Sequence, residues 1–165
     1  MPELITLPLR ETVVLDALES LPADLRRALG WSRLFELALD AVLAADTRSA
    51  TGISQMPVLL TLTTYCYAAN VLCSEDIEAA CFGEADVAFI TSGSAIWAAE
   101  VRQFRRNHRE LIESCLRHVF AAALIEVSQG QASKAWDASA LAAGVGEFAH
   151  RRLNLAILFD TAMSE

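Results

Sequence analysis

No charged residue lies between Arg48 and Glu75, and this uncharged stretch constrains the fold more than any other feature of the sequence. Its later part, residues 56–73 (MPVLLTLTTYCYAANVLC), approaches the ~20 apolar residues that a membrane-spanning helix needs. However, three threonines and Asn70 make it less apolar, and neither end carries the cluster of lysines and arginines that orients a spanning helix. A helix buried on all sides by other helices has the same pattern. We expect that arrangement, and no membrane association.

Outside this stretch the sequence has the pattern of an all-α protein. Alanine is abundant, runs of β-branched residues are short, and apolar residues recur with the i, i+3, i+4 spacing of amphipathic helices. A chain of 165 residues, of which 54% are hydrophobic, can bury a core without disulfides or metal ions. We therefore predict a single all-α domain over residues 1–165, a bundle of about six to eight helices around the buried helix at 57–73.

Turn and capping residues indicate where the helices begin and end. Ser32 and Ser74 are the expected N-cap residues of two of them. Residues 46–55 have the composition of a loop, and Gly144 and Gly146 are expected to break the helical extension at 131–165. Besides the helix at 57–73 and one from Ser32 through Val42, the expected helices span residues 10–21, 22–29, 74–83, 85–91, 95–127, 133–143 and 147–162.

The cysteines bear on the cellular compartment. None of the four forms a C-x-x-C pair, and all lie among apolar neighbours: Cys66, Cys73, Cys81 and Cys115. A disulfide framework is typical of smaller, loop-rich secreted chains, so we expect buried, reduced thiols. The N-terminal sequence has neither the basic region nor the long apolar region of a signal peptide. We therefore expect a cytoplasmic protein.

Positive charge is concentrated in one segment of an otherwise acidic chain. The formal net charge is −8, which argues against a protein that binds nucleic acid over its whole surface. Within the expected helix at 95–127, however, four arginines recur at i, i+3, i+4 and i+7 and should share one face: Arg102, Arg105, Arg106 and Arg109. Such a stripe can contact successive phosphates. A solvated helix face, or internal pairing with the acidic residues at 75–86, has the same pattern.

A set of short motifs runs through residues 57–119. An apolar helix with a tyrosine-rich middle leads into Ser-Glu-Asp-Ile-Glu-Ala-Ala, then Glu-Ala-Asp-Val-Ala-Phe-Ile-Thr-Ser-Gly, and finally Phe-Arg-Arg-Asn-His. In this order and spacing, the stretch resembles the N-terminal domain of DDE-type insertion-sequence transposases. The matching positions are Tyr65, Tyr67, Ser74, Ile77, Glu78, Ala80, Glu84, Asp86, Phe89, Ile90, Gly93, Phe104, Arg105 and His108.

The resemblance implies a helical, DNA-binding type of domain related to mobile elements. Glu75 and Asp76 stand where that family has a basic residue, so we expect any binding of duplex DNA through the four arginines to be weak. The family continues into an RNase-H-like catalytic domain with three metal-binding carboxylates. This sequence has only one more helical segment after residue 120, so we expect no strand transfer by this chain.

No group of residues predicts catalysis, a metal site or a cofactor. Cys115 and His118 lack the second Cys/His pair of a zinc site, and we expect a buried thiol near a histidine there. Residues 144–146 (GVG) lack the preceding strand and the third glycine of a phosphate-binding loop. The three tryptophans lie outside the basic segment and are expected to be packing anchors: Trp31, Trp97 and Trp136. We therefore expect a protein without enzyme activity and without a bound metal or cofactor.

The last expected helix is apolar over most of its circumference. One stripe of it contains Leu153, Ala156, Ile157 and Asp160. Beside this stripe lie Leu155, Leu158 and Phe159, which suit docking onto the core as well as a subunit interface. The sequence thus leaves two functions open. One is weak DNA binding by a relative of the transposase domain; the other is protein–protein interaction or homo-oligomerisation by a module that has lost DNA binding.

Overall fold

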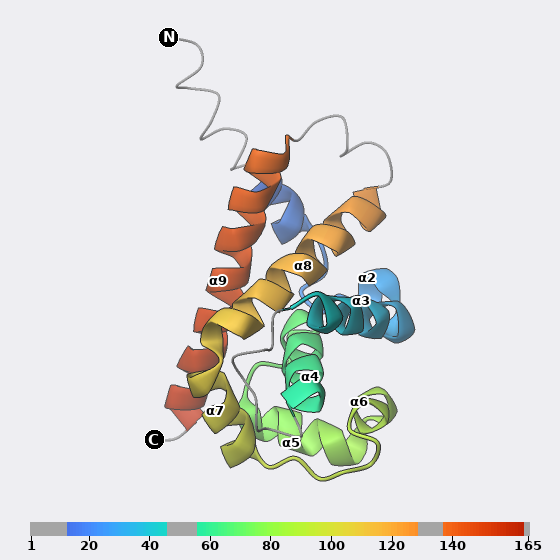
Figure 1. The fold of residues 1–165 in the computed structure, drawn as a ribbon, viewed down its shortest axis with the longest axis vertical. Coiled ribbons are helices and arrows are strands. Elements are labelled where there is room, and N and C mark those ends of the chain that lie inside the picture. Colours follow the sequence, from blue (N-terminus) through green and yellow to red (C-terminus); the bar gives the residue numbers. More distant parts are fainter. Residues whose placement is uncertain (1–12, 46–55, 129–136, 164–165) are drawn as a thin grey trace.

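The computed structural model describes residues 13–45, 56–128 and 137–163, and within these ranges every regular element is a helix (Figure 1). The predicted all-α fold class is therefore confirmed. After a first helix over residues 13–20, the elements are α2 (Arg26–Leu29), α3 (Trp31–Ala44), α4 (Met56–Ala68), α5 (Ser74–Gly83), α6 (Ala85–Ile90), α7 (Ala98–Asn107), α8 (Arg109–Ser128) and α9 (Ala138–Met163). The predicted loop at 46–55, Trp136 and the start of the predicted helix at 133–143 lie outside the described residues.

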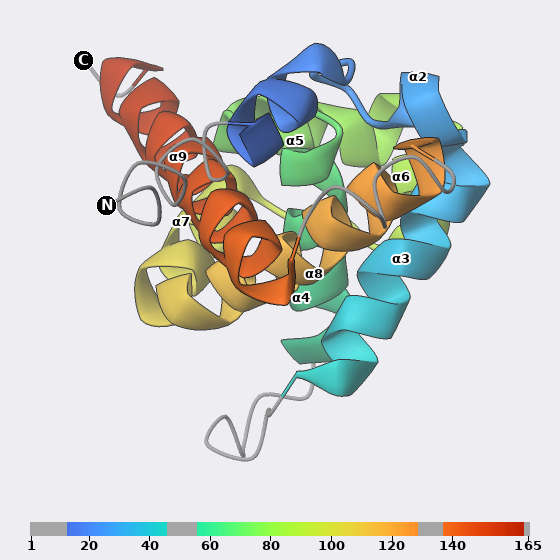
Figure 2. The same ribbon diagram turned by 90° about the horizontal axis from the view of Figure 1, so that it is seen from above.

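Helix α4 is the buried centre of the bundle. All of its residues except Pro57 and Val58 are buried, and α3, α6, α7, α8 and α9 pack around it. From two directions, α4 and α8 lie between α9 on one side and α3 on the other (Figures 1 and 2). Among the described helices, none has the length and apolarity to cross a bilayer. The prediction of a central core helix is confirmed.

Two of the three threonines of α4 are compatible with burial because their hydroxyls bond within the helix. Thr61 Oγ1 donates to the carbonyl oxygen of Pro57 at 2.7 Å, and Thr63 Oγ1 donates to that of Leu59 at 2.6 Å. A hydroxyl that bonds four residues back needs no water and no partner from another helix. Thr61 and Thr63 are thus ordinary core residues, whereas Asn70 is exposed in the turn that follows α4.

The long C-terminal helix differs from the prediction. Gly144 and Gly146 do not interrupt it, since α9 runs unbroken through both, and the predicted break is wrong. Gly144 is buried, and a Cβ on Gly146 would meet the side chain of Arg117 on α8 at 3.8 Å. The T-shaped contact between Phe120 and Phe148 belongs to the same α8–α9 interface. This packing outweighs the cost of about 1 kcal/mol per helical glycine.

The predicted helix at 95–127 is two helices. α7 ends at Asn107 and α8 begins at Arg109, with His108 between them at φ −133° and ψ 35°. The hydrogen bonds continue on both sides, since His108 N–H donates to Phe104 and Ile112 N–H donates to His108, both at 3.0 Å. One residue therefore redirects the chain at little cost in hydrogen bonds, so that α7 can pack on α5 while α8 crosses α3 and α4.

Neither expected serine N-cap is present. The residue before α3 is Gly30 and the residue before α5 is Cys73, and neither helix has a capping side-chain bond from that position. Ser32 lies inside α3. Ser74 is the first residue of α5, and its side chain bonds to α9, so an interhelical contact replaces the local cap.

Candidate functional site

Three helices meet at Asp160, near the end of α9. Its Oδ1 accepts the backbone N–H of Ser74 at 2.7 Å, and its Oδ2 accepts the Ser74 hydroxyl at 2.7 Å. The same carboxylate forms an ion pair with the guanidinium of Arg105 on α7. Since Asp160 is buried at the N-terminus of α5, it also complements the positive end of that helix dipole. We call Asp160, Arg105 and Ser74 the Asp160 network.

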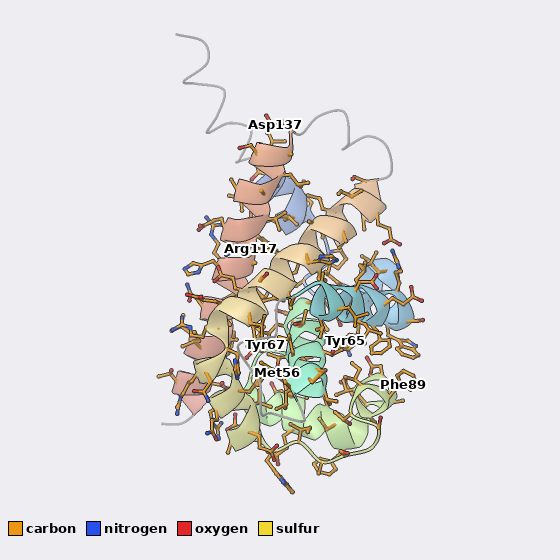
Figure 3. All side chains as sticks on the ribbon, viewed as in Figure 1. Met56, Tyr65, Tyr67, Phe89, Arg117 and Asp137 are labelled. Carbon is orange, nitrogen blue, oxygen red and sulfur yellow. The ribbon has the colours of Figure 1, made fainter. Side chains whose placement is uncertain are left out.

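Arg105 is the innermost cation of the predicted arginine stripe. It is only 4% exposed, and Tyr67 of α4 lies beside it, with the pKa of the Tyr67 hydroxyl raised by burial to about 12. Figure 3 shows Tyr67 in the interior of the bundle. A buried guanidinium that is already paired with a carboxylate does not face a phosphate on the protein surface. The expectation of a stripe shared by all four arginines is wrong on this point.

Arg102 is also paired within the protein. Its guanidinium donates to Glu75 of α5, and the Cys73 thiol donates to the other oxygen of Glu75 at 3.0 Å. These hydrogen bonds from Cys73 and Arg102 lower the pKa of Glu75 to about 2. The internal pairing with the acidic segment at 75–86, which the sequence left open, is what the structure shows for Arg102.

Arg106 and Arg109 are the exposed pair of the four arginines. Arg106 lies in the last turn of α7, and Arg109 is the first residue of α8. The turn at His108 therefore separates them. Within the described residues, neither guanidinium has a recorded ion pair with a carboxylate. Two of the four predicted phosphate contacts thus remain open to solvent, on two helices instead of one.

Cys73, Glu75 and Asp160 have the atoms of a cation site, since their ligand atoms all lie within 4.8 Å of one another. However, Arg102 already pairs with Glu75 and Arg105 with Asp160. A cation bound there would face two guanidinium groups at close range. The charges therefore favour the ion-pair network over a metal centre.

The opposite side of α9 exposes apolar residues. Leu155, Leu158 and Phe159 are 44%, 65% and 50% exposed, whereas Leu153 and Ala156 of the predicted stripe are buried with Asp160. Beyond Arg152 the described part of α9 contains one charged residue, Asp160, and that residue points into the bundle. We call Leu155, Leu158 and Phe159 the α9 face. It is apolar, uncharged and exposed.

The thiols are buried and unbridged, as predicted. Burial raises the pKa of Cys66 well above its usual value and that of Cys115 to about 11. At neutral pH both are protonated, so they lack the thiolate that a nucleophile or a metal ligand needs.

The tryptophans are a second departure from the prediction. Trp31 is 44% exposed and contacts Phe89 of α6, while Trp97 is 52% exposed and contacts Phe82 of α5. Figure 3 shows Phe89 at the outer edge of the molecule. These two tryptophans therefore form surface aromatic contacts and do not anchor the core. Helical periodicity could not distinguish these outcomes, because both residues flank helix ends.

Comparison with protein-family models, with curated proteins and with solved structures finds no match to this chain. The resemblance to transposase N-terminal domains stays a prediction.

Proposed function

We propose that this protein is a non-catalytic helical interaction module that self-associates through the α9 face. The observation that carries the proposal is the exposure of Leu155, Leu158 and Phe159 on the last turns of α9, where the described residues after Arg152 include no exposed charge. The chain has a net charge of −8, so two copies repel one another over most of their surfaces. The α9 face is a place where they can approach without bringing like charges together.

The energetics of this face suit association. Burying a leucine or phenylalanine side chain contributes about 1.5–3 kcal/mol, and a two-fold interface buries each of the three residues twice. Part of that gain offsets the loss of translational and rotational freedom. The cost of ordering is small, because the Asp160 network already fixes the last turns of α9 against α5 and α7.

Analytical ultracentrifugation of the wild type and of Leu158→Asp and Phe159→Asp tests the proposal. We expect a concentration-dependent dimer for the wild type and a monomer for both variants, with unchanged helical circular dichroism. Leu43→Asp is the matched control, since Leu43 is exposed on α3, away from this face, and should leave the dimer intact. A wild type that stays monomeric at high micromolar concentration contradicts self-association. Capture of a different protein that Leu158→Asp abolishes would then identify the face as a heterotypic contact.

Weak binding of duplex DNA is the second candidate, and the exposure of Arg106 and Arg109 favours it. Two phosphate contacts predict a slope of about −2 for log K against log salt concentration, since each contact contributes about −0.9. Fluorescence anisotropy at low salt should show binding that Arg106→Ala with Arg109→Ala removes and that Arg27→Ala, at another exposed arginine, leaves unchanged. No binding at low salt, or equal loss in all variants, contradicts this function.

A further inference from the structure

The outer side of α5 exposes an aromatic pair that packing within the chain does not explain. Phe82 and Trp97 are 64% and 52% exposed, and their ring centroids are 6.1 Å apart with 49° between the ring planes. Large aromatic side chains contribute strongly to the free energy of binding at protein interfaces, because the partner removes them from water. Two of them in contact at the surface form a ready-made apolar anchor point.

The structure holds this pair in place. Trp97 directly precedes α7, and the next residue, Ala98, donates its backbone N–H to Glu78 Oε2 on α5 at 2.8 Å. A side chain of α5 thus fixes the start of α7, and with it the position of Trp97 relative to Phe82. Because Trp97 is already held in place, a partner that binds here loses little free energy in ordering this surface.

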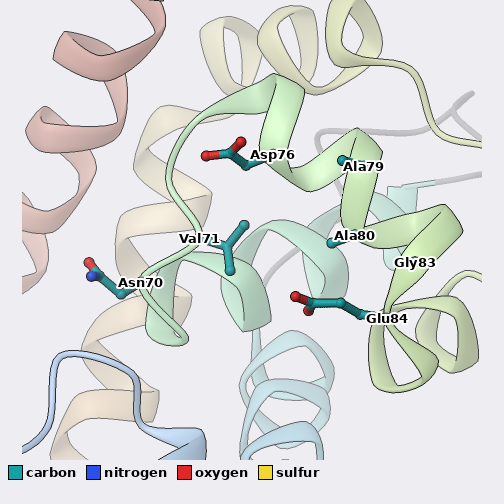
Figure 4. A pocket seen from close by; sticks show the side chains of 7 residues that line it. All are labelled: Asn70, Val71, Asp76, Ala79, Ala80, Gly83 and Glu84. Atoms are coloured by element: carbon teal, nitrogen blue, oxygen red, sulfur yellow. The ribbon is translucent and has the colours of Figure 1, made fainter.

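A pocket lies beside another part of the surface of α5. It has a volume of about 450 Å³ and lies between α5 and the turn at residues 70–71. Figure 4 shows the carboxylates of Asp76 and Glu84 pointing from α5 and its C-terminal end toward that turn. Ala79 lines the pocket and lies three residues before Phe82, on a neighbouring part of the helix surface. Asp76 is six residues before Phe82, so the two residues are about 9 Å apart along the axis of α5.

The charge around the pocket is negative. Residues 74–100 contain six acidic residues and no lysine or arginine. The nearest cation, Arg26, donates to Glu84 at 3.0 Å but also to Asp24 and Asp86, so one guanidinium faces three carboxylates. Asp76 is exposed and has no recorded ion pair within the described residues. A cationic group is the complement of this pocket, and nucleic acid is repelled by it.

We propose that the outer side of α5 binds a basic amphipathic segment of a protein partner. An apolar side chain of that segment packs on Phe82 and Trp97, and a lysine or arginine head enters the pocket between Asp76 and Glu84. In a helical segment that lies along α5, side chains seven residues apart share a face and are about 10 Å apart along the axis, close to the rise between Asp76 and Phe82. This surface does not include the α9 face, so the two proposals can fail separately.

Isothermal titration calorimetry with a synthetic peptide tests this proposal. The probe is a helix of about 18 residues, or five turns, built from leucine and lysine in amphipathic order. The control peptide has the same leucine positions with glutamate in place of lysine. We expect the lysine peptide to bind the wild type, more weakly as salt is added, and the glutamate peptide not to bind.

Variants distinguish a defined site from diffuse attraction. Trp97→Ala should weaken binding about tenfold or more, as expected of a central aromatic anchor. Asp76→Asn should also weaken it, and Leu43→Ala on α3 should not. Trp97 makes no capping side-chain bond to α7, so its replacement should leave the helical circular dichroism unchanged. If the lysine peptide does not bind, or binds both variants as tightly as the wild type, the proposal is wrong.

Discussion

The middle and the end of α9 bury arginine charge in two different ways. At the end of the helix, Asp160 supplies a carboxylate to Arg105. In the middle, Arg152 is buried with no carboxylate partner among the residues that the structure describes, and its guanidinium donates to the carbonyl oxygens of Tyr67 at 2.7 Å and Ala23 at 3.1 Å. It also lies over the rings of Phe120 and Phe148, at 5.3 and 5.5 Å from their centroids.

The two environments have opposite effects on the guanidinium groups. Burial alone would lower the pKa of Arg105, but Asp160 and the Tyr67 hydroxyl more than offset it, and the pKa lies above the usual value. Burial lowers the pKa of Arg152 to about 10, and the remote charge of Asp24 opposes this only in part. The carbonyl of Tyr67 lies at the C-terminal end of α4, where the helix dipole favours a cation. Both guanidinium groups are thus buried, Arg105 in an ion pair and Arg152 among backbone carbonyl groups, which we call the carbonyl cage. The electrostatic cost of burial is higher for Arg152.

Removing the carboxylate should have the largest effect on stability. Asp160→Ala leaves Arg105 buried without its counter-ion and takes two hydrogen bonds from Ser74. We expect a loss of about 3–5 kcal/mol in the free energy of unfolding, measured by urea denaturation. The double variant Arg105→Met, Asp160→Leu should recover most of this loss, because it removes both charges. A loss below about 1 kcal/mol in the single variant would show that Arg105 does not depend on Asp160.

Removing the caged guanidinium should have a smaller effect. Arg152→Met keeps the aliphatic packing but leaves two carbonyl groups without their donor, and we expect a loss of about 2–3 kcal/mol in the same measurement. Arg151→Met is the control, because the ion pairs of Arg151 with Glu19 and Glu147 are exposed, and it should change stability by less than about 0.5 kcal/mol. Equal effects at positions 151 and 152 would contradict the carbonyl-cage interpretation.

Low pH should produce the smallest effect on stability, through the partly exposed carboxylate of Glu75. The pKa of Glu75 is about 2 in the folded protein, below the ordinary value of 4.5. Its contribution to stability is therefore present above about pH 4.5 and is lost as the pH falls toward 2. Because the Glu75 side chain is partly exposed, we expect a modest loss, seen as a lower thermal midpoint. Glu75→Gln should flatten this part of the pH profile, and an unchanged profile would contradict the assignment.

Local patterns in the sequence predicted much of the fold. The uncharged stretch identified the buried helix α4, and Gly30 and Gly83 coincide with the ends of α2 and α5. On α9 the helical period grouped Leu153, Ala156 and Asp160, which are buried, with Ile157, which is partly buried, but it left open whether the residues of the α9 face point to the core or to solvent. These features depend on neighbours within one or two turns, and periodicity reports such relations directly.

The candidate site depended on contacts that periodicity does not contain. Arg105 and Asp160 are 55 residues apart in sequence, so the pattern that grouped Arg105 with other arginines gave no sign of its burial. The burial of Arg152 could not be predicted from the sequence, because its partners are backbone carbonyl groups, which every residue has. Likewise, the continuity of α9 through Gly144 and Gly146 results from its packing on α8, which local helix propensity does not include.

The position of α9 also bears on how the chain is made. Ser74 and Tyr67 contact residues of α9 that are 86 and 85 positions later in the sequence. At about 5–20 residues per second, a ribosome needs on the order of ten seconds to cover that distance. During this interval the N-terminus of α5, the last turn of α4 and the guanidinium of Arg105 all lack their final partners. Completion of the bundle therefore waits for α9, which leaves a period in which a chaperone can bind the nascent chain.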